Sequence, residues 1–484
     1  MDTLDMNINA GDYELHGLGR LNVLLGRNGV GKSRLLRAVD VSDTPSFSTK
    51  KYLSPERSGA LAFQWPVEQQ QANDRDFLRR DRRQNQASQF KPQSASQFAR
   101  LETEVLRAIE GTRRLDLSYA FKNYLDQIND LLENIVIGPV PGQTRGIEFR
   151  AKNGGQPLEP GVISSGESEL IALAIECLVV EFDKKPGEKG LILLDEPDVH
   201  LHPDLQLKLV MLIRSLAEKH DLTVLIATHS TAILAALADY EDARVGFMSA
   251  GQRRINFVVP SNALRAILPI FGAHPLTRVY SEMPLLIVEG DDDVRIWQQA
   301  VRSASGKLMF HPSACGGKGE MATYESEADK VLGAVYDTAI GYSLRDGDGV
   351  VEELEDIGRI VRCRLKCRSS ENLLLTNEVL KSAKTDLARV RAGLARWRDE
   401  HQGHEASAFL AGIEKEQFDR MQANLKPIRN LLAAQLSTSK PWEVLVGQAI
   451  AALPLAGKGK NAEGTLAWAL GDKFVTRVLK EGPA

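Results

Sequence analysis

A glycine-rich segment near the start of the chain, residues 26–33, restricts the possible folds more than any other feature. It reads Gly-Arg-Asn-Gly-Val-Gly-Lys-Ser, follows a short apolar run at 21–25, and precedes a helix-like segment at 34–39. In such a strand, loop and helix, backbone N–H groups wrap phosphates, the lysine meets the β and γ charges and the serine ligates Mg²⁺. The loop therefore predicts an ATP site. Its expected contacts are Asn28, Gly29, Gly31, Lys32, Ser33 and Arg34.

A second apolar run, residues 191–194, ends in two acids, Asp195 and Glu196. A strand that ends this way beside a phosphate loop can hold Mg²⁺ through Asp195 and can polarise the attacking water through Glu196. Either motif alone has an ordinary alternative, a glycine-rich turn or a buried strand with surface acids at its end. Together they favour a P-loop ATPase domain of the α/β class.

The composition fits a protein with more than one domain and no membrane-spanning segment. The chain has 484 residues, 43% hydrophobic and 26% charged, and its longest apolar runs have the length of strands. Its start lacks the basic and apolar regions of a secretory signal, so we expect a cytoplasmic location. The net charge of −4 argues against a globally basic nucleic-acid binder but permits a local basic groove. Four cysteines are too few for a disulfide framework.

Changes in pattern along the chain suggest domain boundaries. We expect the ATPase domain at 1–260, with strands at 146–150, 191–194 and 222–227 and a helix at 203–219 in a largely parallel sheet. An insertion at about 64–140 combines a glutamine-rich, solvated stretch at 64–97 with a helical arm at 99–136. A junction at 261–283 leads to a second α/β domain at 284–376 and a helical region at 377–484. The apolar face of the arm is formed by Phe121, Tyr124, Ile128, Leu131 and Ile135.

Acidic residues follow two further strand-like segments. The apolar run 285–288 ends at Glu289, with Asp293 shortly after, and a later strand ends in Asp346 and Asp348. Acids at neighbouring strand ends can converge on a hard divalent cation, so these four residues are candidate metal ligands. The alternative is that they are acidic loop residues that cap the strands.

Two more segments resemble motifs of ABC ATPases. Residues 164–169, Ser-Ser-Gly-Glu-Ser-Glu, resemble the signature motif, and His229 in Ala-Thr-His-Ser resembles the switch histidine. In that family the signature of one subunit covers the ATP of another. The resemblance therefore implies an ATP-dependent homodimer or higher homo-oligomer, in which Ser165, Gly166 and Glu167 contact the nucleotide.

The same resemblance extends to the neighbourhood of this site. Gln64 is a candidate for the glutamine that senses Mg²⁺, with a solvated glutamine as the equal alternative. Residues 195–203 look like the soluble SMC, RecF and OLD-type relatives, so membrane transport is not expected. Within them, His200 and His202 are expected to shape the loop beside ATP rather than to bind zinc.

The second acidic set resembles the Toprim domain, which has a strand-end glutamate followed by glycine and a later Asp-x-Asp. Glu289, Asp346 and Asp348 match that pattern, and Asp293 is a possible additional ligand. Toprim nucleases bind Mg²⁺ or Mn²⁺ with such acids. By the same resemblance Glu371 is a further ligand or base, with an exposed helix cap as the alternative. Lys473, with Lys366 as rival, is the candidate for an assisting lysine.

Taken together, these motifs resemble OLD-family proteins, in which an ABC ATPase precedes a Toprim nuclease, with related parts in the Gabija and PARIS antiphage systems. The resemblance implies an ATP-controlled, metal-dependent nuclease that acts on DNA or tRNA, with a possible phage-encoded trigger or partner subunit. The alternative is a non-nucleolytic ATPase sensor or scaffold of the RecF kind, in which the Toprim domain serves assembly. The basic cluster at 75–83 and the pair His401 and His404 are expected to be solvated.

Overall fold

A computed structural model of the chain divides into two compact units, Met1–Pro275 and Leu276–Ala484. It describes residues 6–54, 64–66, 69, 73–74, 90–116, 118–143, 145–184, 187–199, 201–238, 240–272, 284–335, 339–415, 418–436, 440–453 and 462–479. No helix within these ranges is long and apolar enough to cross a membrane.

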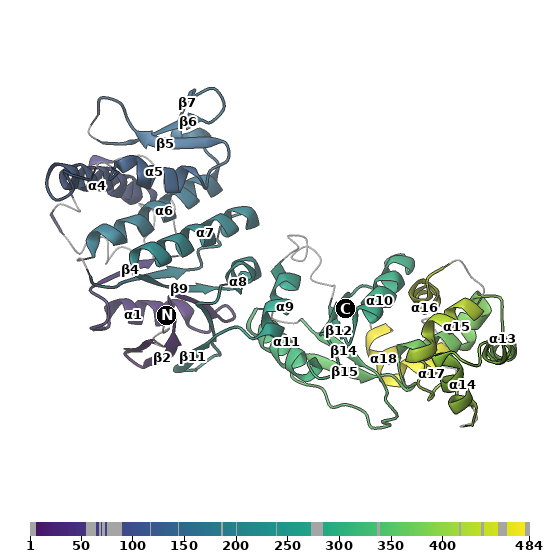
Figure 1. Ribbon diagram of the computed structural model, residues 1–484. Coiled ribbons are helices and arrows are strands. Elements are labelled where there is room, and N and C mark those ends of the chain that lie inside the picture. Colours follow the sequence, from purple (N-terminus) through teal and green to yellow (C-terminus); the bar gives the residue numbers. More distant parts are fainter. Residues whose placement is uncertain are drawn as a thin grey trace. The chain divides into compact units, whose positions relative to one another are not determined.

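An eight-stranded sheet forms the centre of the first unit (Figure 1), with the order β1-β2-β11-β10-β3-β9-β8-β4. The five strands from β10 to β4 are parallel, as predicted, whereas β1 with β2 and β10 with β11 pair antiparallel. Every residue of β3, β8 and β9 is buried, as expected for parallel strands covered on both faces. The strands are β1 (Met6–Ala10), β2 (Tyr13–Leu18), β3 (Leu21–Leu25), β4 (Thr49–Leu53), β8 (Gly190–Asp195), β9 (Leu222–Thr228), β10 (Ala243–Phe247) and β11 (Arg254–Val258).

Helices cover both faces of this sheet. Figure 1 shows α1 (Lys32–Val41) on one side and α6 (Ser165–Asp183) and α7 (Pro203–His220) on the other. The predicted strand, loop and helix around the phosphate loop and the predicted helix at 203–219 are therefore confirmed. Two further helices, α8 (Thr231–Ala238) and α9 (Asn262–Gly272), pack together, and α9 lies where the sequence suggested a junction.

Among its described residues, the expected insertion holds the helices α4 and α5 and the first strand of a small sheet. α4 (Phe90–Glu110) and α5 (Phe121–Asn129) lie next to α6, followed by β5 (Ile135–Pro139), β6 (Ile147–Ala151) and β7 (Pro157–Leu158) in an antiparallel sheet. Tyr124 and Ile128 are buried, as the helical spacing predicts. The assignment of Ile135 to the helix was wrong, because the Asn129 side chain pairs with the backbone of Ile137 and the chain turns into β5. The strand at 146–150 belongs to this small sheet and not to the parallel one.

The expectation of a solvated stretch at 64–97 was wrong for its last part. Residues 91–97 are buried in the first turns of α4, and Gln93 and Gln97 are 0% and 3% exposed. The polar residues of this stretch can be buried where they find a buried partner, and Ser94 donates a hydrogen bond to Glu176 of α6 (2.9 Å). The basic cluster at 75–83 lies outside the described residues.

The second unit contains a four-stranded parallel sheet with the order β13-β12-β14-β15, formed by β12 (Leu285–Val288), β13 (His311–Ala314), β14 (Gly341–Arg345) and β15 (Ile360–Arg364). α10 (Asp291–Ser303) packs on β13, and α11 (Met321–Val335) packs on β12, β14 and β15. A core that includes Val288, Trp297, Leu373 and Phe474 joins the sheet to the later helices.

The segment after this sheet is helical, as predicted (Figure 1). Between α13 and α14 the chain makes the predicted break at residues 402–403, and Pro441 caps α16. The elements are η4 (Ser370–Leu375), α12 (Asn377–Ser382), α13 (Leu387–Glu400), α14 (Glu405–Lys415), η5 (Lys426–Ile428), α15 (Arg429–Gln435), α16 (Trp442–Ala451), α17 (Leu466–Leu470), α18 (Asp472–Phe474) and η6 (Val475–Leu479).

Candidate nucleotide site and acidic pocket

The phosphate loop joins the end of β3 to the start of α1. Gly29 and Gly31 have φ values of +82° and +105°, a left-handed conformation that favours glycine. Lys32 is buried and its Nζ donates to the carbonyl oxygen of Gly26 (2.8 Å), inside the loop. Asn28 and Arg34 are exposed at the mouth of the loop. The loop can therefore cradle an anion, with the Lys32 ammonium group at its centre.

Asp195 ends β8 next to the loop and is fully buried. The Tyr52 hydroxyl, on the neighbouring strand β4, donates a hydrogen bond to Asp195 Oδ2 (2.7 Å), and Ser33 also bonds to this carboxylate. Burial raises the pKa of Asp195, whereas the hydrogen bonds from Tyr52 and Ser33 lower it and the charge of Glu196 raises it. Burial and the charge of Asp195 also raise the pKa of Tyr52. Ser33 and Asp195 thus lie together, as a shared Mg²⁺ would require.

Glu196 follows Asp195 at a turn with φ +46°, an unusual value for a residue other than glycine. Its Oε1 lies 3.5 Å from Lys32 Nζ and 3.7 Å from His229 Nδ1. The nearby His229 lowers the pKa of Glu196, burial opposes this, and the charge of Lys32 lowers it further. The other ring nitrogen of His229 lies 3.8 Å from Asp198 Oδ2. Residues from β8, β9 and the phosphate loop therefore converge around one carboxylate.

The signature segment begins α6. Ser164 caps the helix, and its Oγ accepts a hydrogen bond from the Glu167 N–H (3.2 Å) and donates one to Glu167 Oε2 (2.8 Å). Ser164 and Ser165 are exposed, and Gly166 and Glu167 are half-buried. The start of α6 is therefore exposed, and the positive end of its helix dipole can attract an anion.

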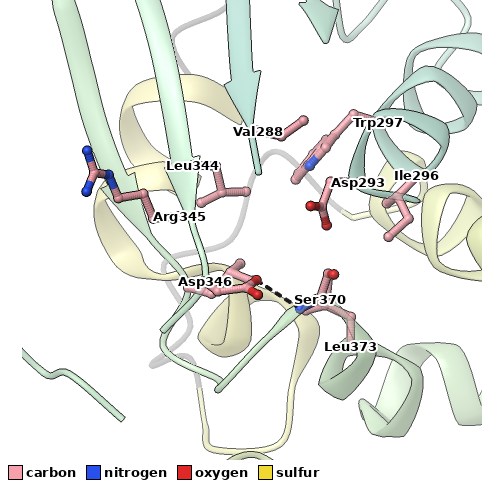
Figure 2. A pocket seen from close by; sticks show the side chains of 10 residues that line it. Val288, Asp293, Ile296, Trp297, Leu344, Arg345, Asp346, Ser370 and Leu373 are labelled. Carbon is pink, nitrogen blue, oxygen red and sulfur yellow. Dashed lines mark hydrogen bonds between the residues drawn. The ribbon is translucent and has the colours of Figure 1, made fainter. Parts of the chain in front are cut away.

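In the second unit, a small pocket beside the ends of β12 and β14, here called the acidic pocket, has two acids, Asp293 and Asp346, in a mostly apolar lining. The pocket has a volume of about 10 Å³, roughly the room of one water-sized species, and Asp293, Asp346 and Ser370 are among its lining residues. Figure 2 shows Asp293, Asp346 and Ser370 around it, while the Arg345 side chain points away. The N–H groups of Ser370 and Gly290 donate to Asp346 Oδ1 (3.2 Å) and to Asp293 Oδ2 (3.0 Å).

The candidate Glu289 belongs to the same group. Its Oε1 accepts the backbone N–H of Asp346 (2.9 Å). Burial raises the pKa of Asp346 to about 7, and the charges of Asp293 and Glu289 raise it as well. Burial also raises the pKa of Asp293, with Glu371 and Glu289 adding to the effect. The structure therefore brings Glu289, Asp293, Asp346 and Glu371 close enough for their charges to interact.

Lys426, at the start of η5, is the lysine at this pocket. Its Nζ donates to Asp346 Oδ2 (2.9 Å). Burial alone would lower the pKa of Lys426, but Asp346 and the charges of Glu371 and Glu289 raise it. The two lysines suggested from the sequence lie elsewhere: Lys473 pairs with Asp356 (2.7 Å) and Lys366 with Asp472 (2.6 Å). No local motif marks Lys426, which sequence reasoning missed.

Two further candidates differ from expectation. Asp348 itself has φ +47° and pairs with Lys318 Nζ (2.6 Å), which lies in the glycine-rich segment 315–319. Glu371 is not an exposed helix cap, because it is 5% exposed in η4. Its Oε2 atom is buried and has no hydrogen-bond partner among the described residues. A buried carboxylate oxygen with nothing to bind is costly, and a cation would satisfy it.

The chemistry of these donors fits a hard divalent cation, since all are carboxylates. In the described part of the chain, however, no three His, Cys, Asp or Glu side chains are already arranged around one metal position. Lys426 and backbone N–H groups bind the carboxylates instead. A metal would therefore require Lys426 to release Asp346.

The remaining candidates stay outside both sites. His202 is exposed and lies 3.3 Å from Asp204, while His200 falls outside the described residues. Gln64 is exposed. His401 and His404 are exposed and pack on the Trp397 ring, with centroid distances of 4.4 and 5.2 Å, in agreement with a solvated pair.

Residues 52–235 match the family described as "AAA domain, putative AbiEii toxin, Type IV TA system". The chain is also similar to the thiamine import ATP-binding protein ThiQ of Aliivibrio fischeri, with 38% identity over 81 residues, 17% of this chain and 31% of that protein. The Salmonella choleraesuis ThiQ is 28% identical over 136 residues, 26% of this chain and 54% of that protein. The matches thus span about a third and about half of these relatives.

Among solved structures, an SMC head bound to the C-winged helix domain of ScpA is 14% identical, with a TM-score of 0.33 over 54% of this chain and 98% of that one. An SMC ATPase from work on ATP-driven dimerization is 19% identical, with a TM-score of 0.25 over 35% and 96%. The matched family, the ThiQ similarity and the phosphate-loop geometry define the first unit as an AAA-type P-loop ATPase domain similar to ABC-type ATPases.

Proposed function

We propose that this protein is an ATP-controlled, divalent-metal-dependent nuclease of the OLD type, with a Toprim domain in its second unit, that acts on DNA or tRNA in bacterial antiphage defence. The observation that carries this proposal is the acidic pocket. Glu289, Asp293, Asp346 and Glu371 share one small region, and a lysine, Lys426, reaches into it.

The four carboxylates would hold Mg²⁺ or Mn²⁺ in this pocket. Such a cation would supply Lewis-acid stabilisation of a phosphate and a water of lowered pKa. Glu289 would fix the end of β14 through the N–H of Asp346 while offering its second oxygen. Lys426, once released from Asp346, would place its ammonium group where negative charge develops on a phosphate. Asp348 would join after it releases Lys318.

The ATPase unit would act as the control element. Lys32, Ser33 and Asp195 would hold ATP and Mg²⁺, while Glu196, oriented by His229, would position the attacking water for slow hydrolysis. The exposed start of α6 at Ser164 would complete the site of a second copy, so ATP would favour a homodimer. ATP would then control the acidic pocket because the two assembly states, the monomer and the ATP-bound homodimer, would differ at this pocket.

Cleavage by matched variants tests the proposal. Purified full-length protein is incubated with plasmid DNA and with total tRNA, in Mg²⁺, in Mn²⁺ or in EDTA, with and without ATP. We expect cleavage only with metal, and a fall of at least about 100-fold for Glu289→Ala and for Lys426→Ala. Lys473→Ala is the matched control, because this lysine pairs with Asp356 and lies outside the pocket. Lys32→Ala tests the ATP control.

Two results would contradict the proposal: cleavage that survives Glu289→Ala, or equal losses of cleavage for Lys426→Ala and Lys473→Ala.

A second function, a non-nucleolytic ATPase sensor or scaffold of the RecF kind, is favoured by one observation. Lys426 already pairs with Asp346 (2.9 Å), so this carboxylate has a cationic partner without a metal. If the wild type hydrolyses ATP but cleaves neither substrate with either metal, the scaffold function becomes the better explanation.

A further inference from the structure

A strongly basic segment precedes and forms α13 in the second unit. Residues 381–398 contain six basic residues and one acidic residue, although the whole chain has a net charge of −4. Two acids, Asp399 and Glu400, follow at the end of the helix. Neither proposed site uses this segment. The basic residues are Lys381, Lys384, Arg389, Arg391, Arg396 and Arg398.

The helix has one apolar face and one ridge of small side chains. Val390 and Leu394 are buried against the rest of the unit. On the opposite side, at spacings of four and three residues, lie Ala388, Ala392 and Ala395. Ala388 and Ala392 are exposed and Ala395 is half-buried. Over residues 388–395 the outward surface of the helix therefore carries only small side chains, and the exposed Asp399 continues the same line at the last turn.

Arginines flank this alanine ridge on both sides. Arg389 and Arg396, seven residues and thus about two turns apart, lie on one side. Arg391 and Arg398, with the same spacing, lie on the other. Arg391 stays exposed above the ring of Phe418, at 5.1 Å from its centroid. The helix thus presents two parallel rows of positive charge separated by a strip of methyl groups.

The first row is the more available for a partner. Arg389 is 75% exposed, and its pair with Asp386 (3.5 Å) is also open to solvent, so that pair is weak. Arg396 is exposed and forms no ion pair within the described ranges. In the second row, Arg398 is bound to Glu414 and Asp399. An anionic partner would therefore gain most from Arg389 and Arg396.

We infer that this face of α13 docks double-stranded DNA, with the alanine ridge in the major groove and an arginine row along each phosphate backbone. An α-helix with its side chains is about 10–12 Å wide, which matches the roughly 12 Å major groove of B-form DNA. The major groove of A-form RNA is too narrow to admit a helix. The inference rests on the proposed function and narrows its substrate class to duplex DNA.

The docking face and the acidic pocket are parts of one compact unit. α13 packs on α15, and α15 packs on both η4 and η5, which contain Ser370 and Lys426 of the pocket. The same helix that supports the docking face therefore borders the groups proposed to act on phosphate. Arginine contacts to phosphates give affinity and orientation without reading a sequence.

Binding measured without metal tests the inference independently of cleavage. The full-length protein is titrated in EDTA against labelled duplex DNA, duplex RNA and tRNA, with fluorescence anisotropy at several salt concentrations. For Arg389→Glu/Arg396→Glu we expect the DNA affinity to fall about tenfold or more. The slope of log K against log salt should shrink by about 0.9 for each phosphate that the variant no longer neutralises. The matched control, Arg302→Glu/Lys307→Glu, reverses two exposed charges near the end of α10.

The outcomes separate this inference from the proposed nuclease. Any one of four results would overturn the docking face. These are equal DNA binding by the wild type and the α13 variant, an equal fall in affinity for the control, tighter binding of duplex RNA than of DNA, and no DNA binding by the wild type. If instead the α13 variant alone loses DNA affinity while Glu289→Ala cleaves like the wild type, the docking face holds and the proposed catalytic pocket fails. Circular dichroism of each variant checks that the helices remain folded.

Discussion

Tyr52→Phe would remove one oxygen atom from the ATPase unit and leave the ring in place. Tyr52 is 3% exposed, and its hydroxyl donates at 2.7 Å to the fully buried Asp195. The phenylalanine fills the same space, so no cavity forms. The change removes the short bond to Asp195 together with a longer one that the hydroxyl accepts from Arg37 Nε (3.4 Å). Asp195 keeps its bond to Ser33.

The expected cost is that of a hydrogen bond to a charged group, about 1.5–3 kcal/mol, or roughly 10- to 150-fold in an equilibrium constant. The loss should be local to β4 and β8, which the hydrogen bond joins side by side. Hydrogen exchange measured by mass spectrometry on the nucleotide-free protein reports the opening free energy of peptides from these strands. In Tyr52→Phe we expect the opening free energy of the β4 and β8 peptides to fall by about 1.5–3 kcal/mol.

Tyr240→Phe is the matched control, because its hydroxyl bonds to the largely exposed Arg214 and not to the nucleotide site. This control should leave exchange in β4 and β8 unchanged. Unaltered protection in Tyr52→Phe, or an equal change in the control, would refute the idea that Tyr52 stabilises the Asp195 carboxylate.

Three further predictions concern the second unit. Gly347→Ala would push a Cβ into the carbonyl oxygen of Cys367 and should lower the free energy of unfolding by at least about 1–3 kcal/mol. Gly412→Ala, in an open helix position, should be neutral or stabilising by up to about 1 kcal/mol. Urea unfolding compares the two variants, and equal stabilities would contradict the clash. Glu325→Ala would leave two arginines of neighbouring strands without their shared carboxylate and should lower the free energy of unfolding by about 3–5 kcal/mol; a loss below about 1 kcal/mol would show that the pairs are weak. Because the pKa of Asp346 rises from 3.8 to about 7, the folded state retains a proton that the unfolded state releases. The metal-free protein should therefore lose up to about 4 kcal/mol of stability as the pH rises from about 4 to 7, and Asp346→Asn should remove that part of the pH dependence.

The features that sequence reasoning predicted well depend on contiguous residues. The phosphate loop, its flanking strand and helix, and the acids that end β8, β12 and β14 are all local patterns, and the structure has them at the predicted places. Parallel strands bring their ends to one edge, so the approach of Glu289 to Asp346 followed from topology alone.

The features it missed join residues far apart in the chain. Lys426 reaches Asp346 across 80 residues, and Tyr52 reaches Asp195 across 143, without a local motif at either lysine or tyrosine. Lys473 was suggested by the family resemblance, but in the structure it pairs with Asp356. The glutamine-rich start of α4 was expected in solvent because composition cannot reveal a buried partner such as Glu176.

The burial of α6 has a consequence for shortened forms of this protein. Every residue from 168 to 180 in this helix is buried, and α4 and α5 of the insertion pack on it together with α7, β4 and β8. The helices of the insertion thus cover the buried helix α6 and are part of the packed core of the ATPase unit. A chain that lacks residues 64–140 would expose the mostly apolar helix α6, which follows the signature segment. We expect such a chain to aggregate before it could bind ATP.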